Sequence, residues 1–340
     1  MIAIVTVYKS NNYGSYLQAK ALYTILKKYD DQVCFLDFNQ RKYQIFRGIV
    51  SSIVKMYGIK RLKRTFQNYQ YWNKLPSITL KGISNRDDIT YVIGSDEIWN
   101  VKKKGMLYPQ FWGINLKGKL FSYAVSSNNS RYGDIIESGF YTRLNDFKSI
   151  SVRDQTTFET ISKLTNNPVS VVLDPTLLFD VDFYAKQVKR KKIPFDYVAA
   201  YTLSDKGYAH EIEALRSIFR SKNLKIISVG IWKYWCDSYI INEDFNPYLE
   251  YVDAKYVVTN TFHGTAFAIN FEKQFVVFSQ NNQKITDLLN QFGLGNRNIF
   301  GKSQEEILNV LNQKIDYTRI LDIKNEMRKK SITFIEDSLK

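Results

Sequence analysis

Short runs of β-branched and aromatic residues alternate with longer segments of helical periodicity over most of the 340 residues. This alternation predicts parallel sheets covered by helices, because a helix usually joins one parallel strand to the next. A first series of strand-like runs comprises Ile2–Tyr8, Val33–Phe38, Ile89–Gly94, Leu120–Ser126, Ile150–Val152 and Val169–Leu173. A second series comprises Tyr197–Leu203, Lys225–Gly230, Tyr256–Thr259 and Phe275–Phe278. The helical patterns include a segment beginning at Ser15, then Glu211–Ser221, Ile285–Gln291 and Ile320–Leu339.

The two series predict two domains. The acids Asp180 and Asp182 and the basic cluster Lys189–Lys192 interrupt the alternation between them. We therefore expect an N-terminal domain over residues 1–180 and a C-terminal domain over residues 181–340, with a closing helix at 320–339. The predicted fold class is α/β, with two Rossmann-like domains facing a cleft. Ligands of such sheets bind at the carboxyl ends of the strands.

Composition excludes several classes of protein. The chain is 44% hydrophobic and 24% charged, which is ordinary for a packed globular protein. Its two cysteines, Cys34 and Cys236, cannot form a disulfide framework and favour a reducing compartment. The first eight residues lack the basic start of a signal peptide, and no apolar run approaches the length of a membrane span. We therefore expect a cytoplasmic protein. With two histidines and two cysteines, none close together, we expect no dedicated metal site.

The positive charge is concentrated in one stretch. Lys and Arg exceed Asp and Glu by 48 to 33, a net charge of +15, and eleven of the basic residues lie between Phe38 and Arg86, where there is no acid. Apolar residues recur at helical spacing within residues 41–66, which predicts a basic amphipathic helix. Three interpretations remain open: contact with an anionic membrane surface, binding of nucleic acid, and packing of the apolar stripe into the domain. The first and third are compatible, and we favour them together.

The segment from Tyr256 to Ala266 is the strongest candidate for chemistry. An apolar strand leads directly into a turn with His263 and Gly264, and then into the start of a helix. Such a turn directs backbone N–H groups and the positive end of a helix dipole at one point, which suits a phosphate or carboxylate. His263 there is placed to bind the anion or to transfer a proton. The alternative is that His263 only holds the turn by hydrogen bonds.

Three other turns carry polar residues after a strand. Arg153 follows Ile150–Val152 and offers a planar fork for a carboxylate or phosphate, or alternatively forms a surface pair with Asp154. Asp96 and Glu97 follow Ile89–Gly94 and are candidate general bases, unless Ser95 and Asp96 cap a following helix. The turn at residues 11–15 follows the first strand and is lined with amide and small side chains.

These segments, in this order, resemble the polysaccharide pyruvyl transferase family. The resemblance rests on Asn12-Tyr13-Gly14 with Gln18-Ala19, Gly94–Asn100, Ser151–Asp154, Leu173–Thr176, Thr261–Gly264 and Lys284–Leu289. It implies a fold like that of two-domain GT-B glycosyltransferases, with the donor in the interdomain cleft. It also implies transfer of the enolpyruvyl unit of phosphoenolpyruvate onto a sugar of a lipid-linked surface-polysaccharide precursor. The product is a cyclic pyruvate ketal, phosphate is released, and no cofactor is needed beyond this co-substrate.

Carried over residue by residue, the resemblance makes Arg153 and His263 the donor-binding pair. Further donor contacts are expected at Gly264, Thr265 and Lys284, and the Asp174-Pro175 step is expected to shape a turn. From the chemistry of these residues we expect His263 to supply or relay the proton, and Asp96 or Glu97 to deprotonate the acceptor. The expected acceptor contacts are Asn12, Tyr13, Gly14, Ser95, Trp99 and Trp232, the last in an aromatic loop suited to sugar stacking or to a hydrophobic latch. The sequence departs from the family at Phe271–Gln274, where such proteins often have Gly-Lys-Pro. The resemblance therefore implies no site role for Lys273.

The sequence thus predicts a cytoplasmic pyruvyltransferase of polysaccharide or capsule biosynthesis, peripheral at the inner face of the plasma membrane. Its expected partners are a lipid-linked oligosaccharide acceptor and an anionic membrane surface, without nucleic acid. One alternative is a nucleotide-sugar-dependent glycosyltransferase of GT-B-like fold. Another, from a different class, is a non-catalytic basic protein associated with membrane or nucleic acid.

Overall fold

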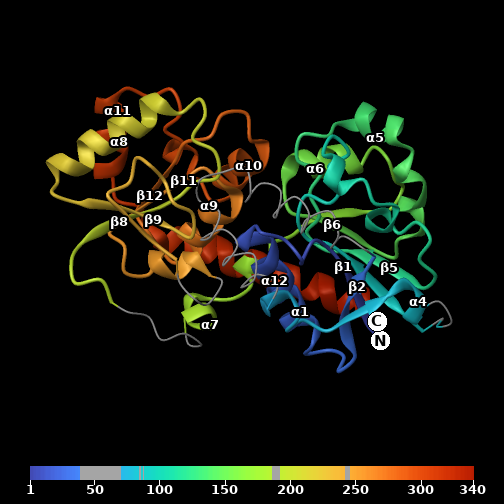
Figure 1. Ribbon diagram of the computed structural model, residues 1–340. Coiled ribbons are helices and arrows are strands. Elements are labelled where there is room, and N and C mark those ends of the chain that lie inside the picture. Colours follow the sequence, from blue (N-terminus) through green and yellow to red (C-terminus); the bar gives the residue numbers. More distant parts are fainter. Residues whose placement is uncertain (39–69, 84–85, 87, 186–191, 242–245) are drawn as a thin grey trace, which may run out of the picture. The chain divides into compact units, whose positions relative to one another are not determined.

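The computed structural model describes residues 1–38, 70–83, 86, 88–185, 192–241 and 246–340 (Figure 1). The predicted basic helix at residues 41–66 lies outside these described residues. The chain divides into two compact units: unit 1 is Met1–Pro175 with Lys329–Lys340, and unit 2 is Thr176–Arg328. The expected boundary lay between residues 180 and 181. The C-terminal helix α12 (Tyr317–Leu339) contributes residues to both units.

Unit 1 contains a parallel five-stranded sheet in the order β3-β2-β1-β4-β5. Its strands are β1 (Ile2–Val5), β2 (Val33–Asp37), β3 (Ser77–Thr79), β4 (Thr90–Ile93) and β5 (Lys119–Ser122). A parallel pair, β6 (Ile150–Val152) and β7 (Val169–Val171), adjoins β5 through single bridges. The sequence patterns predicted all of these except β3. That strand has two exposed residues out of three, so it has no apolar run to reveal it.

The helices of unit 1 surround a core rich in aromatic side chains. Buried Trp99 and Trp112 stack with ring centroids 5.0 Å apart, and Phe147 meets Trp99 edge-on. The α-helices are α1 (Tyr13–Leu26), α4 (Leu80–Ile83), α5 (Tyr132–Ser138) and α6 (Gln155–Ile161). The 3₁₀ helices are Lys104–Met106, Pro109–Trp112, Phe140–Asp146 and Pro175–Leu177, the last of which crosses into unit 2.

Unit 2 repeats the same strand order, β10-β9-β8-β11-β12, again all parallel. Its strands are β8 (Tyr197–Tyr201), β9 (Lys225–Val229), β10 (Ser238–Ile240), β11 (Tyr256–Thr259) and β12 (Phe275–Val277). Its other helices are α7 (Val181–Ala185), α8 (Ala209–Ser221), α9 (Phe262–Asn270), α10 (Gln283–Gln291), α11 (Gln304–Asn312) and the 3₁₀ helices Pro247–Tyr251 and Gly295–Arg297. Helices α8 and α11 pack side by side (Figure 1). Only β10, which lacks a buried residue, escaped the sequence patterns among these strands.

Both sheets therefore have the Rossmann-like arrangement that the alternation predicted. In each sheet the second and third strands add to one side of the first strand, and the fourth and fifth strands add to its other side. This reversal opens the space between the loops at the carboxyl ends of the two central strands, where α/β proteins bind ligands. In unit 1 these are the loops after β1 and β4, and in unit 2 the loops after β8 and β11. Among the described residues, no helix combines the length and apolar character needed to cross a membrane.

Candidate functional site

In unit 1 the loop after β4 is fixed by close backbone packing. Gly94 has a φ of +126°, and a Cβ atom at this position would lie 2.2 Å from the carbonyl oxygen of Tyr123. Asp96 has a φ of +80°, and its backbone forms a bridge with Val125, beyond the end of β5. No helix begins here, so the alternative that Ser95 and Asp96 cap a helix is wrong. The chain instead extends the sheet and places the Asp96 side chain at its carboxyl edge.

Arg153 lies at the end of β6 and is almost fully buried, with 1% of its side chain exposed. Its Nη1 donates to Asp174 Oδ2 at 2.7 Å, and its Nη2 donates to Asp96 Oδ1 at 3.3 Å. Burial disfavours the charged guanidinium, but Asp174, Asp96 and Asp154 outweigh it, so the pKa of Arg153 is raised. The surface pair with Asp154 is therefore not what forms. Asp174 was expected only to shape a turn, and it is instead a buried ion-pair partner.

A network of hydrogen bonds behind Asp96 joins β1, α1 and the loop after β4. Ser15 Oγ donates to Asp96 Oδ2 at 2.6 Å, and Ser95 Oγ donates to Gln18 Oε1 at 2.7 Å. Thr6 Oγ1 donates to the Ser95 carbonyl at 2.7 Å and accepts from Gln18 Nε2 at 3.2 Å. The sequence patterns gave no such supporting role to Thr6, Ser15 or Gln18, and they assigned Ser95 to the acceptor. A usable signal was present, however, because Ser15 and Gln18 are polar residues on the buried face of α1.

Glu97, the second candidate base, lies beside Asp96 but has different partners. Its Oε1 pairs with Lys103, and its Oε2 accepts from Asn128 Nδ2 at 2.8 Å. Burial lowers the pKa of Lys103 and the Glu97 carboxylate raises it, with a net upward shift. Unit 1 therefore brings Asp96, Glu97 and Arg153 together at the carboxyl edge of its sheet, each held by a charged partner.

The predicted acceptor contacts of unit 1 are largely internal. Trp99 is fully buried, and its Nε1 donates to the Phe111 carbonyl at 2.7 Å. Ser95 is likewise fully buried. Asn12 caps α1 through a bond from the Gly14 amide to its Oδ1 at 3.0 Å, and Tyr13 is buried. The expectation that Trp99 and Ser95 touch the acceptor is corrected, since the aromatic core and the network around Asp96 enclose them.

In unit 2 the turn between β11 and α9 is shorter than predicted, because the helix begins at Phe262 and already contains His263 and Gly264. Thr261 is the N-cap of α9, and its Oγ1 accepts from the Gly264 amide at 2.9 Å. His263 lies in the first turn, 5% exposed, with its ring edge-on to that of Phe262. A Cβ atom on Gly264 would lie 2.1 Å from Thr259 Oγ1, so only glycine permits the helix to start this close to the strand. The helix dipole directs positive potential at this turn.

Hydrogen bonds join the chain at the ends of β8 and β11. His263 therefore follows the sheet at the point where its strand order reverses, between β8 and β11. Thr259 Oγ1 donates to the Tyr201 carbonyl at 2.7 Å. Asn260 accepts from the Leu203 amide at 3.0 Å through Oδ1, and its Nδ2 donates to the Ser204 carbonyl at 2.6 Å. Thr265, a predicted donor contact, is fully buried and bonds back to the Thr261 carbonyl. Lys284 is half-buried in the first turn of α10, after the neighbouring strand β12.

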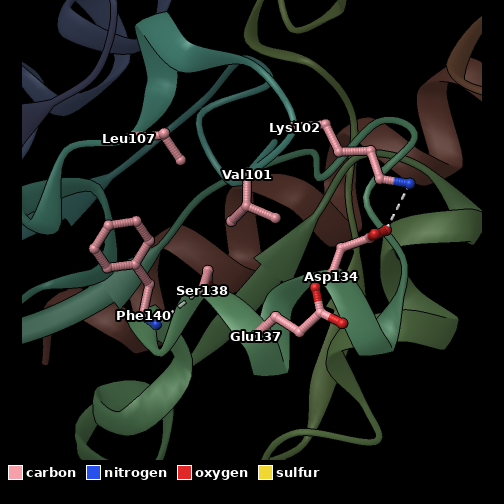
Figure 2. Close-up of a pocket in the computed structure, with 7 residues that line it drawn as sticks. All are labelled: Val101, Lys102, Leu107, Asp134, Glu137, Ser138 and Phe140. Atoms are coloured by element: carbon pink, nitrogen blue, oxygen red, sulfur yellow. Dashed lines mark hydrogen bonds and ion pairs between the residues drawn. The ribbon is translucent and has the colours of Figure 1, made fainter.

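The predicted donor pair is thus divided between the units, with Arg153 in unit 1 and His263 in unit 2. A separate open hollow of about 410 Å³ lies in unit 1, lined by Val101, Lys102, Leu107, Asp134, Glu137, Ser138 and Phe140 (Figure 2). Lys102 Nζ and Asp134 Oδ2 are 2.8 Å apart across it. None of the predicted site residues lines this hollow.

A family model described as polysaccharide pyruvyl transferase matches residues 12–282, a range that contains Asp96, Arg153 and His263 and ends just before Lys284. No curated protein matches the chain.

Solved structures share the fold at very low sequence identity. A putative UDP-N-acetylglucosamine 2-epimerase from Listeria monocytogenes is 9% identical with a TM-score of 0.60, covering 100% of this chain and 95% of that one. The glycotransferase of kitacinnamycin is 10% identical with a TM-score of 0.53, covering 100% and 99%. The UDP-GlcNAc 2-epimerase from Neisseria meningitidis is 9% identical with a TM-score of 0.51, covering 99% and 98%. The expected GT-B-like α/β fold is confirmed, and the family match over most of the chain shows that this protein belongs to the polysaccharide pyruvyl transferase family, a family of transferase enzymes.

Proposed function

We propose that this protein transfers the enolpyruvyl unit of phosphoenolpyruvate to a sugar, forms a cyclic pyruvate ketal and releases phosphate. The observation that carries the proposal is the position of His263. It lies in the first turn of α9, where the strand order of the unit 2 sheet reverses between β8 and β11. A helix N-terminus favours a bound anion, and phosphoenolpyruvate carries a phosphate and a carboxylate on one carbon. His263 adds a group able to move a proton beside that anion.

The proposed reaction balances with two hydroxyl groups of one sugar. His263 delivers a proton to the terminal vinyl carbon of phosphoenolpyruvate, which becomes the methyl group, and C2 becomes an oxocarbenium-like centre. One sugar hydroxyl attacks C2 and loses its proton to a base. The C2–O bond to phosphate then breaks, and the second hydroxyl closes the ring while its proton leaves with the phosphate. No oxidant, reductant or further co-reactant is required.

The unit 1 residues have proposed parts in the same reaction. Asp96 or Glu97 serves as the base that deprotonates the acceptor hydroxyl, and both are side chains at the carboxyl edge of the sheet. Arg153 remains a predicted donor ligand from the family resemblance. Its bonds to Asp96 and Asp174 also give it the part of a positioning residue, which fixes the Asp96 carboxylate.

We further propose that the acceptor is a lipid-linked precursor of a surface polysaccharide, used at the inner face of the plasma membrane. The support is compositional, since eleven basic residues and no acidic one lie between Phe38 and Arg86. Anionic lipid attracts such a segment by about 1 kcal/mol for each basic residue near the surface. Flotation with liposomes tests this point: equal recovery with neutral and anionic liposomes contradicts an electrostatic attachment.

The experiment for the donor site is a thermal-shift titration with phosphoenolpyruvate, with inorganic phosphate and a UDP-sugar as controls. A ligand at a hundred times its dissociation constant stabilises a protein by about 2.7 kcal/mol, a readily measured shift. We expect saturable stabilisation by phosphoenolpyruvate in the wild type, and loss of it in His263→Ala and His263→Gln. The matched control is His210→Ala, which removes the other histidine from an exposed position on α8.

The outcomes separate the candidate functions. Stabilisation by the UDP-sugar alone indicates a glycosyltransferase, and stabilisation by no ligand contradicts the donor site. Phosphate release from phosphoenolpyruvate in the presence of saccharides gives the second readout. Loss of a general acid slows turnover by about 10²–10⁴-fold. A His263→Ala enzyme that keeps turnover within about threefold of the wild type, about 0.7 kcal/mol in barrier, refutes the assigned role.

A further inference from the structure

The loop after β9 in unit 2 exposes large aromatic side chains. Trp232 is 48% exposed and Tyr234 is 65% exposed, and Leu203, in the adjoining loop after β8, is 52% exposed. We call Leu203, Trp232 and Tyr234 the aromatic ledge. A large apolar side chain left in water forgoes the stabilisation that burial would give it. Exposed aromatic residues in one loop at the carboxyl edge of a sheet therefore indicate a binding surface.

The loop is anchored so that these rings face outward. Lys233, between the two exposed aromatic residues, is buried and pairs with Asp205 Oδ1 at 3.0 Å. Its Nζ also donates to the Leu203 carbonyl at 3.3 Å, which joins the loop after β9 to the loop after β8. Trp235, the next residue along, is 1% exposed. Because Lys233 and Trp235 are held inside, Trp232 and Tyr234 are presented to solvent on a fixed stretch of backbone.

The loops that carry the aromatic ledge are linked by hydrogen bonds to the segment that precedes His263. The strand order is β9-β8-β11, so two strand spacings, about 10 Å, separate the end of β9 from the end of β11. Leu203 lies between them, and its amide donates to Asn260, three residues before His263. A short oligosaccharide bound to the aromatic ledge spans this distance.

The chemistry of the aromatic ledge favours a neutral ring over a charged group. The Lys233 ammonium is balanced by Asp205, so this ion pair does not provide a cation for a phosphate. What Trp232 and Tyr234 offer are flat apolar faces with a polar edge, suited to the C–H face of a pyranose. We infer that the aromatic ledge binds a pyranose ring of the acceptor saccharide by stacking against Trp232 and Tyr234. This inference rests on the proposed function, in which a sugar is the acceptor.

The test is an array of immobilised glycans, probed with the full-length wild type and three variants. Trp232→Ala/Tyr234→Ala removes both ring faces, and Trp232→Phe keeps both, with a smaller ring at position 232. The matched control is Phe195→Ala, since Phe195 is also an exposed aromatic residue (45%) but precedes β8, at the opposite edge of the sheet. Because all of these side chains are exposed, unchanged thermal melting is expected and confirms that the variants fold.

We expect saturable binding to at least one pyranose-containing glycan in the wild type and in Phe195→Ala. Binding is expected to weaken at least about tenfold in the double variant, equivalent to about 1.4 kcal/mol, and to recover partly in Trp232→Phe. Fluorescence gives a second readout, because the other four tryptophans are at most 2% exposed. Acrylamide therefore quenches mainly Trp232, and the bound glycan is expected to protect it.

Glycan binding that the double variant retains overturns the inference, as does the absence of wild-type binding to every glycan. Phosphoenolpyruvate titration of the same samples keeps this result separate from the proposed function. Donor binding without glycan binding refutes the aromatic ledge alone. Glycan binding without donor binding refutes the pyruvyl donor and leaves the saccharide site standing.

Discussion

The buried Arg153 ion pair supports a quantitative prediction. The side chains of Arg153 and Asp174 are each 1% exposed, and that of Asp96 is 9% exposed. Arg153→Met removes the cation and leaves two carboxylates in a site closed to solvent. Breaking a buried pair in this way costs about 3–5 kcal/mol, because the remaining charge is uncompensated. For a domain of 150–250 residues, such as unit 1, each kcal/mol shifts the Tm by about 2–4 °C, so a decrease of about 6–20 °C is expected.

The assay is thermal unfolding of Arg153→Met, Asp174→Leu and the double variant, with Lys102→Met as the control. Replacing both partners by apolar residues removes the uncompensated charge at Asp174, so the double variant is expected to melt above Arg153→Met. Lys102 pairs with Asp134 at 2.8 Å, but its side chain is 53% exposed. Solvent screens that pair, so its loss should cost less than about 1 kcal/mol.

Two results would refute this reasoning. The first is an Arg153→Met protein that melts within about 3 °C of the wild type, since about 1 kcal/mol is too little for a buried pair. The second is a double variant less stable than either single variant, which would mean that the two side chains do not compensate each other. The prediction also affects donor studies: an Arg153 variant tests phosphoenolpyruvate binding only at temperatures where unit 1 remains folded.

Two further predictions concern unit 2. Gly264→Ala is expected to destabilise the protein by about 1–3 kcal/mol, because the new methyl group overpacks against Thr259 Oγ1. A melting temperature equal to that of the wild type would contradict the packing of α9 on β11. The hydrogen bond from Arg328 lowers the pKa of Asp180 in the folded protein. The ionised carboxylate therefore stabilises the folded state at pH values above its unfolded pKa of about 4. This stabilisation is lost as the pH falls through the lower pKa of the folded state. Asp180→Asn should therefore melt below the wild type at pH 7 and match it near pH 2; an equal difference at both pH values would argue against the pair.

Much of the fold was predictable from local patterns. The runs that became β6 and β11 were predicted with their observed bounds. The helix expected after His263 and Gly264 begins earlier, at Phe262, so that both residues lie in its first turn. Strands β3 and β10 were not predicted, because edge strands of three residues with exposed or half-buried side chains lack an apolar run. The predicted basic helix at residues 41–66 lies outside the described residues.

In the candidate sites the sequence patterns identified residues but did not predict which of them are buried. The patterns marked Arg153, Asp96 and His263 because each follows a strand, and the carboxyl ends of parallel strands gather at one edge. They placed Trp99 and Ser95 against the acceptor, whereas packing encloses both. A motif specifies residue types at a spacing, but burial depends on what the rest of the chain places over them.

The sequence by itself determined most strands of the described residues, the α/β class and the family, because periodicity, turn residues and motif order are properties of neighbouring positions. The tertiary structure alone decided which charges meet. Arg153 pairs with Asp174, 21 residues away, and with Asp96, 57 residues away, while Ser15 reaches Asp96 over 81 residues. It also decided which aromatic rings face water, since Trp235 is buried beside Lys233 while Trp232 and Tyr234 are exposed. These outcomes depend on distances across the sheets, which no local pattern encodes.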